Sequence, residues 1–135
     1  MPDPVGYSGK PLIQKLGLKD GQTLKPVDAP EGYIDWIEPL PLGAVVDAAA
    51  DQADLVHLFV RDRAELEHGV RAALAAVRPG GMLWTSWPKK ASPLFRDLTE
   101  DGLRAVLLPT GWVDVKVCAV SADWSGLKFL RRKAA

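Results

Sequence analysis

The residues of this chain that are best suited to bind a ligand lie together in the segment Trp87-Pro88-Lys89-Lys90-Ala91-Ser92. The two lysine ammonium groups and the Ser92 hydroxyl can donate hydrogen bonds to a phosphate or a carboxylate. The indole of Trp87 offers a flat surface on which a cation or a ring can stack. The alternative is a pair of solvated lysines beside a packed tryptophan, because lysine side chains are mostly exposed. This segment is the leading candidate for binding a small anionic or nucleotide ligand.

A second candidate is the segment Glu31-Gly32-Tyr33, which opens a predicted helix. Backbone amides at a helix start can bind an anion, although the Glu31 carboxylate would repel one. An ordinary capped helix start is therefore the alternative. Trp124 lies in a predicted hairpin loop, where its ring either forms a contact surface or folds back over the core.

The histidines and the cysteine do not form a catalytic or metal-binding pattern. His57 lies in the middle of an apolar run with no serine or cysteine at a nucleophile motif near it, so we expect a buried, hydrogen-bonded side chain. His68 falls on the outer face of a predicted helix. Cys118 is the single cysteine, which excludes a disulfide framework and predicts a buried, inert thiol. No metal site is expected, because the ligand residues are few and widely spaced.

Length and composition predict one globular domain over residues 1–135, with a loose leader at 1–9 and a basic tail at 132–135. Seventeen basic and seventeen acidic side chains cancel, so the whole chain has no electrostatic attraction for nucleic acid or membrane. The carboxyl-terminal cluster of Lys128, Arg131, Arg132 and Lys133 is either a solvated tail or a nucleic-acid patch. No apolar run approaches the roughly 18 residues of a membrane span, and no signal peptide is recognisable. We expect a cytoplasmic protein.

The elements that must position the candidate site are organised around a strand, helix and strand within residues 54–90. An almost unbroken apolar run from Leu55 to Val60 predicts a strand covered on both faces. Asp62 is a good N-cap, and Glu65 completes a capping box. The helix then presents one apolar stripe to the sheet, formed by Leu66, Val70, Ala73, Leu74 and Val77. A turn at Pro79-Gly80-Gly81 ends the helix, and a second strand begins at Met82, which gives a right-handed parallel crossover.

The remaining elements extend this unit into an α/β fold. We expect helices over 11–16 and 30–37, a helix capped by Thr99, strands over 23–28 and 44–46 with a linker at 48–53, and a hairpin of strands 112–120 and 126–131. Pro26 suits an edge, an end or a bulge of the first strand. The order predicts a three-layer, Rossmann-like open sheet of about six mostly parallel strands with an antiparallel C-terminal hairpin. Ligands of such sheets bind beyond the carboxyl ends of the strands.

The run from Ala53 to Lys90, with its joint Val77-Arg78-Pro79-Gly80-Gly81-Met82-Leu83, resembles the second half of a class I S-adenosylmethionine-dependent methyltransferase. The resemblance implies a reduced methyltransferase-like topology without a third strand, and it places Asp47 where that family has a ribose-binding acid. A structural or solvated role is the alternative for Asp47. The family's glycine-rich cofactor loop corresponds to Val27-Asp28-Ala29-Pro30-Glu31-Gly32, which has one glycine, while Pro30 lacks an N–H donor. The cofactor therefore stays unassigned, and S-adenosylmethionine is disfavoured.

The whole chain also resembles a family of small bacterial domains of unknown function. The shared features are Tyr7-Ser8-Gly9, Ala29-Pro30-Glu31-Gly32, Trp87-Pro88-Lys89-Lys90-Ala91-Ser92, Asp97-Leu98-Thr99-Glu100 and Trp124-Ser125-Gly126-Leu127. This resemblance supports the fold and implies no mechanism. The sequence favours a non-catalytic binding or regulatory module, which could pair with a protein partner or form a homodimer through its hairpin edge. The alternatives are an S-adenosylmethionine- or nucleotide-dependent enzyme that uses the carboxyl edge of the sheet, and a weak nucleic-acid binder.

Overall fold

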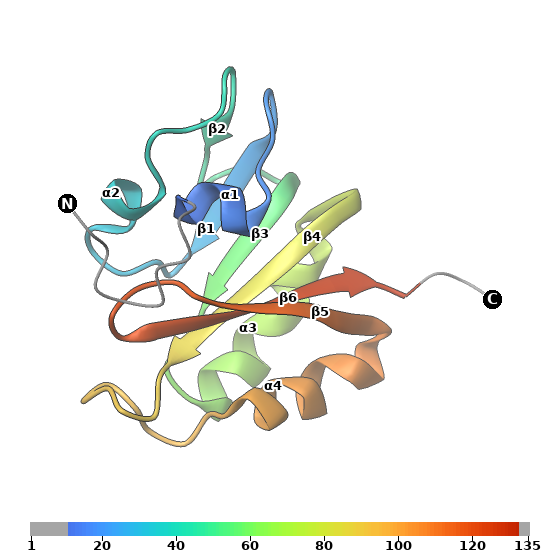
Figure 1. Cartoon of the computed structure of the whole chain (residues 1–135). Coiled ribbons are helices and arrows are strands. Elements are labelled where there is room, and N and C mark those ends of the chain that lie inside the picture. The colour runs from blue at the N-terminus through green and yellow to red at the C-terminus, as the bar shows by residue number, and fades with distance from the viewer. Residues whose placement is uncertain (1–10, 133–135) are drawn as a thin grey trace.

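The computed structural model describes residues 11–132, so the predicted leader and residues 133–135 of the predicted tail lie outside the described part (Figure 1). One six-stranded sheet has the strand order β2-β1-β3-β4-β6-β5. The strands are β1 (Thr23–Val27), β2 (Val45–Val46), β3 (Ala53–Phe59), β4 (Val77–Pro88), β5 (Trp112–Ala119) and β6 (Trp124–Arg131). The helices are α1 (Leu12–Leu16), α2 (Tyr33–Ile37), α3 (Arg63–Ala75), α4 (Glu100–Leu107) and a short 3-10 helix, η1 (Leu108–Thr110).

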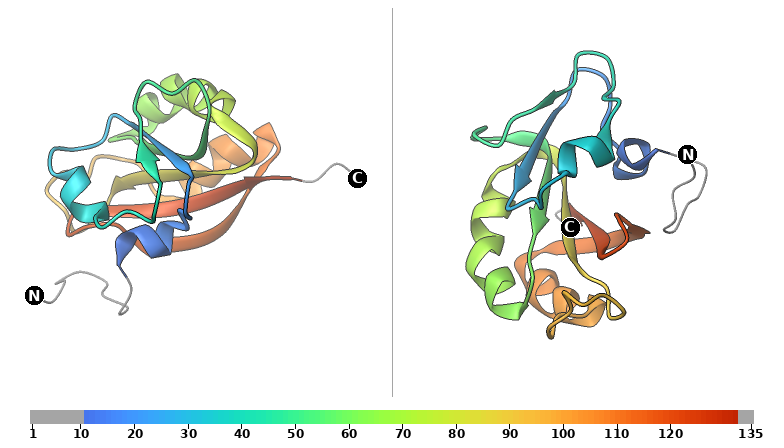
Figure 2. Two further views of the ribbon diagram at one scale, coloured as in Figure 1. Left: turned by 90° about the horizontal axis from the view of Figure 1, so that it is seen from above. Right: turned by 90° about the vertical axis from the view of Figure 1, so that its left-hand side faces the viewer.

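The pairing of the strands confirms the predicted open, mostly parallel sheet. β2, β1, β3 and β4 are parallel neighbours, and β6 runs antiparallel to both β4 and β5. The antiparallel strand is therefore β6, in the interior of the sheet, and β5 forms the edge. α1 and α2 lie on one face of the sheet and α3 and α4 on the other, which gives the predicted three layers (Figure 2).

The two faces of β3 explain its continuous apolar sequence. Leu55 and Phe59 pack into the core under α1 and α2, while Val56 and Leu58 pack into the core under α3 and α4. Each of the four side chains is at most 1% exposed. A strand covered by helices on both sides needs apolar residues at successive positions, because alternate residues point to opposite faces.

α3 begins as its capping residues predict. The Asp62 carboxylate accepts a hydrogen bond from the Glu65 N–H at 2.9 Å, and the Glu65 carboxylate accepts one from the Arg61 N–H at 2.8 Å. The end of this helix differs from the prediction. α3 ends at Ala75, and Val77 pairs with Ala53 as the first residue of β4.

The segment Pro79-Gly80-Gly81 is part of β4 and does not form the predicted turn. β4 is irregular here, since its register against β3 shifts between Ala53 and Leu55. A Cβ atom on Gly81 would lie 2.6 Å from the carbonyl oxygen of Asp54. The backbones of the two strands therefore approach so closely that only glycine fits at this position.

The first crossover begins later than predicted. α2 starts at Tyr33 rather than Pro30, because Gly32 adopts a left-handed conformation with φ of 88° that a helix cannot include. β1 lies inside the sheet despite Pro26. β2 pairs only with Thr23 and Leu24, so Pro26 lies beyond the end of β2 and its missing N–H leaves no ladder bond unmade.

Trp124 is the first residue of β6, which begins two residues before the predicted strand. Its side chain is 3% exposed and packs edge-to-face on Phe59, with ring centroids 5.1 Å apart. Of the two alternatives for Trp124, folding back over the core is therefore correct. The ring belongs to the same core cluster as Leu55 and Phe59 of β3.

Candidate functional site

The carboxyl ends of β1, β3 and β4 meet at one edge of the sheet, and the segment that follows β4 leaves from this edge (Figure 1). A hollow of about 450 Å³ lies between this segment, α4 and the start of β6. Its lining comes from three parts of the chain: Trp87, Lys89 and Lys90; Thr99, Glu100, Asp101 and Arg104; and Ser125. The fold thus brings three of the predicted site residues, Trp87, Lys89 and Lys90, to one surface.

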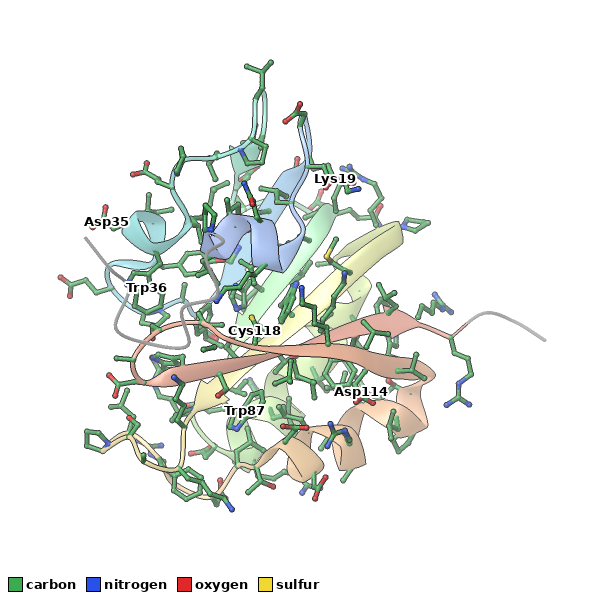
Figure 3. All side chains as sticks on the ribbon, viewed as in Figure 1. Lys19, Asp35, Trp36, Trp87, Asp114 and Cys118 are labelled. Carbon is green, nitrogen blue, oxygen red and sulfur yellow. The ribbon has the colours of Figure 1, made fainter. Side chains whose placement is uncertain are left out.

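The opposite wall of the hollow is formed by ion pairs around Arg104. Its guanidinium donates to Asp114 at 2.9 Å and Asp101 at 3.0 Å, and it also pairs with Glu100. The carboxylates of Asp114 and Glu100 raise the pKa of Arg104. Three basic and two acidic side chains line the hollow, and Glu100 and Asp101 lie opposite Lys89 and Lys90. In Figure 3, Trp87 and Asp114 lie on the α4 side of the hairpin.

Thr99 positions the acidic wall by capping α4. Its hydroxyl oxygen accepts a hydrogen bond from the Gly102 N–H at 3.1 Å. Glu100 and Asp101 then fall in the first turn of the helix, where negative side chains are favoured by the helix dipole. Nothing in the local sequence pattern of these acids indicates that they line the same hollow as Lys89 and Lys90.

Ser92 has a different position from the one its sequence neighbours suggest. Its hydroxyl donates to the Asp123 carboxylate at 2.9 Å and accepts from the Leu94 N–H at 3.0 Å. Asp123 also accepts the Lys89 N–H on its carbonyl oxygen at 2.8 Å. Ser92 does not line the hollow; it ties the lysine segment to the turn between β5 and β6.

Asp47, Glu31 and Gly32 lie on the β1 and β2 side of the sheet and do not line the hollow. The Asp47 carboxylate accepts the Ala49 N–H at 2.9 Å, so it caps a turn, and its side chain is otherwise exposed. Glu31 is exposed ahead of α2, and Gly32 occupies the N-cap position without a side-chain cap. The structure thus separates these three predicted residues from Trp87, Lys89 and Lys90.

A polar network that the sequence did not reveal lies under α2. His57 Nδ1 is 2.7 Å from the Tyr33 hydroxyl, and His57 Nε2 is 2.7 Å from the Ser86 hydroxyl. Burial lowers the pKa of His57 to about 3 and raises the pKa of Tyr33. The expectation of a buried, hydrogen-bonded histidine is confirmed. A serine and a histidine at this distance resemble an activated nucleophile, but both are 0% exposed, so no substrate can reach them.

The thiol of Cys118 and the second histidine, His68, lie outside the hollow. Cys118 is half-buried rather than buried, and burial raises the pKa of its thiol, which disfavours the reactive thiolate. His68 is exposed on α3. Within residues 11–132, no group of three histidine, cysteine, aspartate or glutamate residues is placed to hold a metal ion. The helices of this same range are too short or too polar to cross a membrane.

A scan against protein-family models and a search of curated proteins each found no match to this chain. Solved structures do resemble it. An S-adenosylmethionine-dependent methyltransferase from Geobacter sulfurreducens, in complex with S-adenosyl-L-homocysteine, has 11% identity and a TM-score of 0.62, covering 94% of this chain and 92% of that chain. A ribosomal protein L11 methylase from Lactobacillus delbrueckii subsp. bulgaricus has 10% identity and a TM-score of 0.60, covering 90% of this chain and 76% of that chain.

A possible exported protein from Bordetella parapertussis has 15% identity and a TM-score of 0.64, with 91% of this chain and 66% of that chain covered. At such low identities, these likenesses concern the fold alone. The chain has the α/β fold of the S-adenosylmethionine-dependent methyltransferases.

Proposed function

We propose that this chain binds a small anionic or nucleotide ligand in the hollow between the end of β4 and α4, and acts as a binding or regulatory module. The observation that carries this proposal is the convergence of Trp87, Lys89 and Lys90 on one hollow of about 450 Å³ at the carboxyl edge of the sheet. The volume lies within the range of small-molecule sites. The lysines would attract a phosphate, and Trp87, which is 6% exposed, would form an apolar floor under the ligand.

The second candidate function is S-adenosylmethionine-dependent methyl transfer. The comparisons favour it over a non-catalytic role, because the solved structures of similar fold include proteins described as methyltransferases. In this reading the carboxyl edge of the sheet would hold the cofactor, and an acceptor substrate would lie beside it. The relation to the small bacterial domain family is compatible with both candidates.

The residues at the end of β1 do not fit that cofactor well. Ala29, Pro30 and Glu31 occupy the loop in which close backbone approach needs glycine, and Pro30 has no N–H to donate. The carbonyl oxygen of Gly32 accepts the N–H groups of Asp35 and Trp36. β2, with two residues, is the edge strand on this side, so no further strand of the described residues flanks the loop.

Thermal unfolding with a ligand panel tests both candidates. ATP, ADP, pyrophosphate, S-adenosylmethionine and S-adenosylhomocysteine are added at millimolar concentration to the wild type and to the double variant Lys89→Gln/Lys90→Gln. A ligand at 100 times its Kd stabilises by about 2.7 kcal/mol, which raises the Tm by several degrees. The double variant Arg63→Gln/Arg71→Gln, which removes the same charge from the exposed face of α3, is the matched control.

The proposed site requires that a phosphate-bearing ligand stabilises the wild type and the control but not Lys89→Gln/Lys90→Gln. Stabilisation by S-adenosylhomocysteine that is equal in all three proteins would replace the proposal with the second candidate. If no ligand changes the Tm of the wild type, both candidate functions are contradicted.

The proposal also includes a single domain over residues 1–135, a cytoplasmic location and a homodimer through the hairpin edge. Support for the dimer comes from β5, an edge strand on which Val115 and Val117 are about half exposed. Light scattering tests it. A mass of two chains that falls to one in Val117→Lys would support the dimer, and a single-chain mass for the wild type would contradict it.

A further inference from the structure

Lys116 on β5 and Lys128 on β6 lie directly opposite each other in the antiparallel hairpin. Like charges at opposed positions of two strands destabilise a sheet. Neither ammonium group forms an ion pair with any carboxylate among residues 11–132. A local pattern that costs stability without a visible compensation indicates a functional role.

Two more lysines reach the same place from α1 and the turn that follows it. The Lys15 ammonium group donates to the carbonyl oxygen of Ala119, at the end of β5, at 3.4 Å. The Lys128 Nζ atom would lie 3.9 Å from a Cβ atom on Gly17, the residue that ends α1. Burial, together with the positive charges of Lys116 and Lys19, lowers the pKa of Lys128. We call Lys15, Lys19, Lys116 and Lys128 the lysine cluster.

The lysine cluster lies on the face of the sheet that carries α1, whereas α3 and α4 cover the opposite face. Figure 3 shows Lys19 beside α1 and Cys118, which follows Lys116 by two residues, on the hairpin. Burial raises the pKa of the Cys118 thiol, and the positive charges of Lys15 and Lys116 act against that rise. The cluster is separate from the hollow, which lies between the hairpin and α4.

We infer that the lysine cluster binds the phosphodiester backbone of a nucleic acid. The four ammonium groups of the lysine cluster have no carboxylate partner in the described part of the chain, so an anion with several charges would bind them best. Lysine is a compact point charge, which suits single phosphate oxygens. The cations are spread along α1 and two strands, so an extended polyanion reaches more of them than a small phosphate does. Trp84 and Trp124, on the strands of this face, are buried and cannot stack on bases, and contacts to phosphates carry no information about base sequence.

Fluorescence anisotropy with a labelled 20-base-pair duplex at several salt concentrations tests this inference. Four phosphate contacts give a slope of log K against log salt of about −3.6 for the wild type, and Lys116→Gln/Lys128→Gln lowers its magnitude to about 1.8. The variant weakens binding at low salt by roughly tenfold or more. The double variant Arg63→Gln/Arg71→Gln, with the same net charge, keeps the slope of the wild type. Lys89→Gln/Lys90→Gln also keeps it, which separates this site from the proposed ligand hollow.

The free protein gives a second readout. Removal of the like-charged pair raises the Tm of Lys116→Gln/Lys128→Gln by about 1–4 °C in low salt, so weaker binding cannot be attributed to misfolding. The inference fails if the wild type does not bind the duplex, or if Arg63→Gln/Arg71→Gln weakens binding as much as the cluster variant does. It also fails if tripolyphosphate or a polyglutamate peptide binds the cluster more tightly than the duplex does, since the partner is then a small anion or an acidic protein.

Discussion

The Nε2 atom of His57 on β3 lies 2.7 Å from the hydroxyl oxygen of Ser86 on β4, and its Nδ1 atom lies the same distance from the Tyr33 hydroxyl on α2. A neutral imidazole has one N–H donor and one acceptor nitrogen, and a hydroxyl can serve either. Both hydrogen bonds are therefore satisfied without a charge. An imidazolium at this position would be buried with no carboxylate partner among residues 11–132, so the network holds His57 neutral.

The stability of the fold should therefore decrease as the pH falls below about 6.5, the ordinary pKa of histidine. The folded protein lowers the pKa of His57 to about 3, so between these values the unfolded chain binds a proton that the folded chain does not. The contribution is fully present above the unfolded pKa. It is lost by up to about 1.4 kcal/mol per pH unit as the pH falls towards the folded pKa. Urea unfolding at pH values from about 7 to 5 measures this slope.

Two histidine variants identify the source of the slope. His57→Gln should remove most of it, and His68→Gln, at an exposed position on α3, should keep it. Exposed carboxylates contribute equally to all three proteins, so the difference between the slopes isolates His57. An unchanged slope in His57→Gln would contradict the assignment.

Neighbouring hydroxyls on β4 should respond in opposite directions to removal. Thr85 and Ser86 are both 0% exposed, but the Thr85 hydroxyl has no hydrogen-bond partner among the described residues, whereas Ser86 bonds to His57. Ser86→Ala leaves a buried nitrogen without its partner and should cost about 1–3 kcal/mol. Thr85→Val removes an unsatisfied hydroxyl and should be neutral or stabilising. Midpoints of urea unfolding measure both, and a large loss in Thr85→Val would show that its hydroxyl has a partner.

The two glycines at the start of β4 should differ strongly in their tolerance of alanine. A Cβ atom on Gly81 would lie 2.6 Å from the Asp54 carbonyl oxygen and 2.9 Å from that of Arg78, which are backbone atoms that cannot rotate away. Gly81→Ala should cost about 3 kcal/mol or more, since the strands must separate. Gly80 has φ of 83° with open space around it, so Gly80→Ala should cost only about 1–2 kcal/mol of backbone strain. Similar losses in the two variants would contradict the close approach of β3 and β4.

Arg104 should stabilise the protein by joining α4 to β5. Arg104→Gln breaks the hydrogen bond to Asp114, whose side chain is 27% exposed, and should cost about 1 kcal/mol. The loss should shrink at high salt, because these groups remain accessible to counterions. Arg63→Gln breaks an ion pair within α3 that is 44% and 57% exposed, and it should cost less than about 0.5 kcal/mol. Equal effects would indicate that the Arg104 pairs contribute no more than an ordinary surface pair.

The local elements of this fold could be predicted because their causes lie close together in the sequence. Asp62 caps α3 through Glu65, three residues away, and Thr99 caps α4 in the same manner. The strand ends were less certain, since Val77 and Trp124 belong to strands only through partners distant in the chain. A single apolar or aromatic residue next to a helix or turn does not indicate by its local sequence that it pairs with a distant strand.

In the candidate site, too, some residues could be grouped from the local sequence and others depend on tertiary packing. The sequence could group Trp87, Lys89 and Lys90 as candidates because they are nearly contiguous and follow a strand end. Glu100, Arg104 and Ser125 complete the hollow from α4 and β6, and their positions depend on how the hairpin packs against that helix. Ser92 was assigned to the site on contiguity alone, although its hydroxyl is held by Asp123.

The sequence by itself determined the α/β class, the parallel crossover and the segment that carries the candidate lysines, since these follow from residue periodicity, caps and turns. Only the tertiary structure decided that His57 meets Ser86 and that Lys116 lies opposite Lys128. Strand register joins residues far apart in the chain, and the irregularity between Asp114 and Lys116 shifts it by a residue that no local pattern marks.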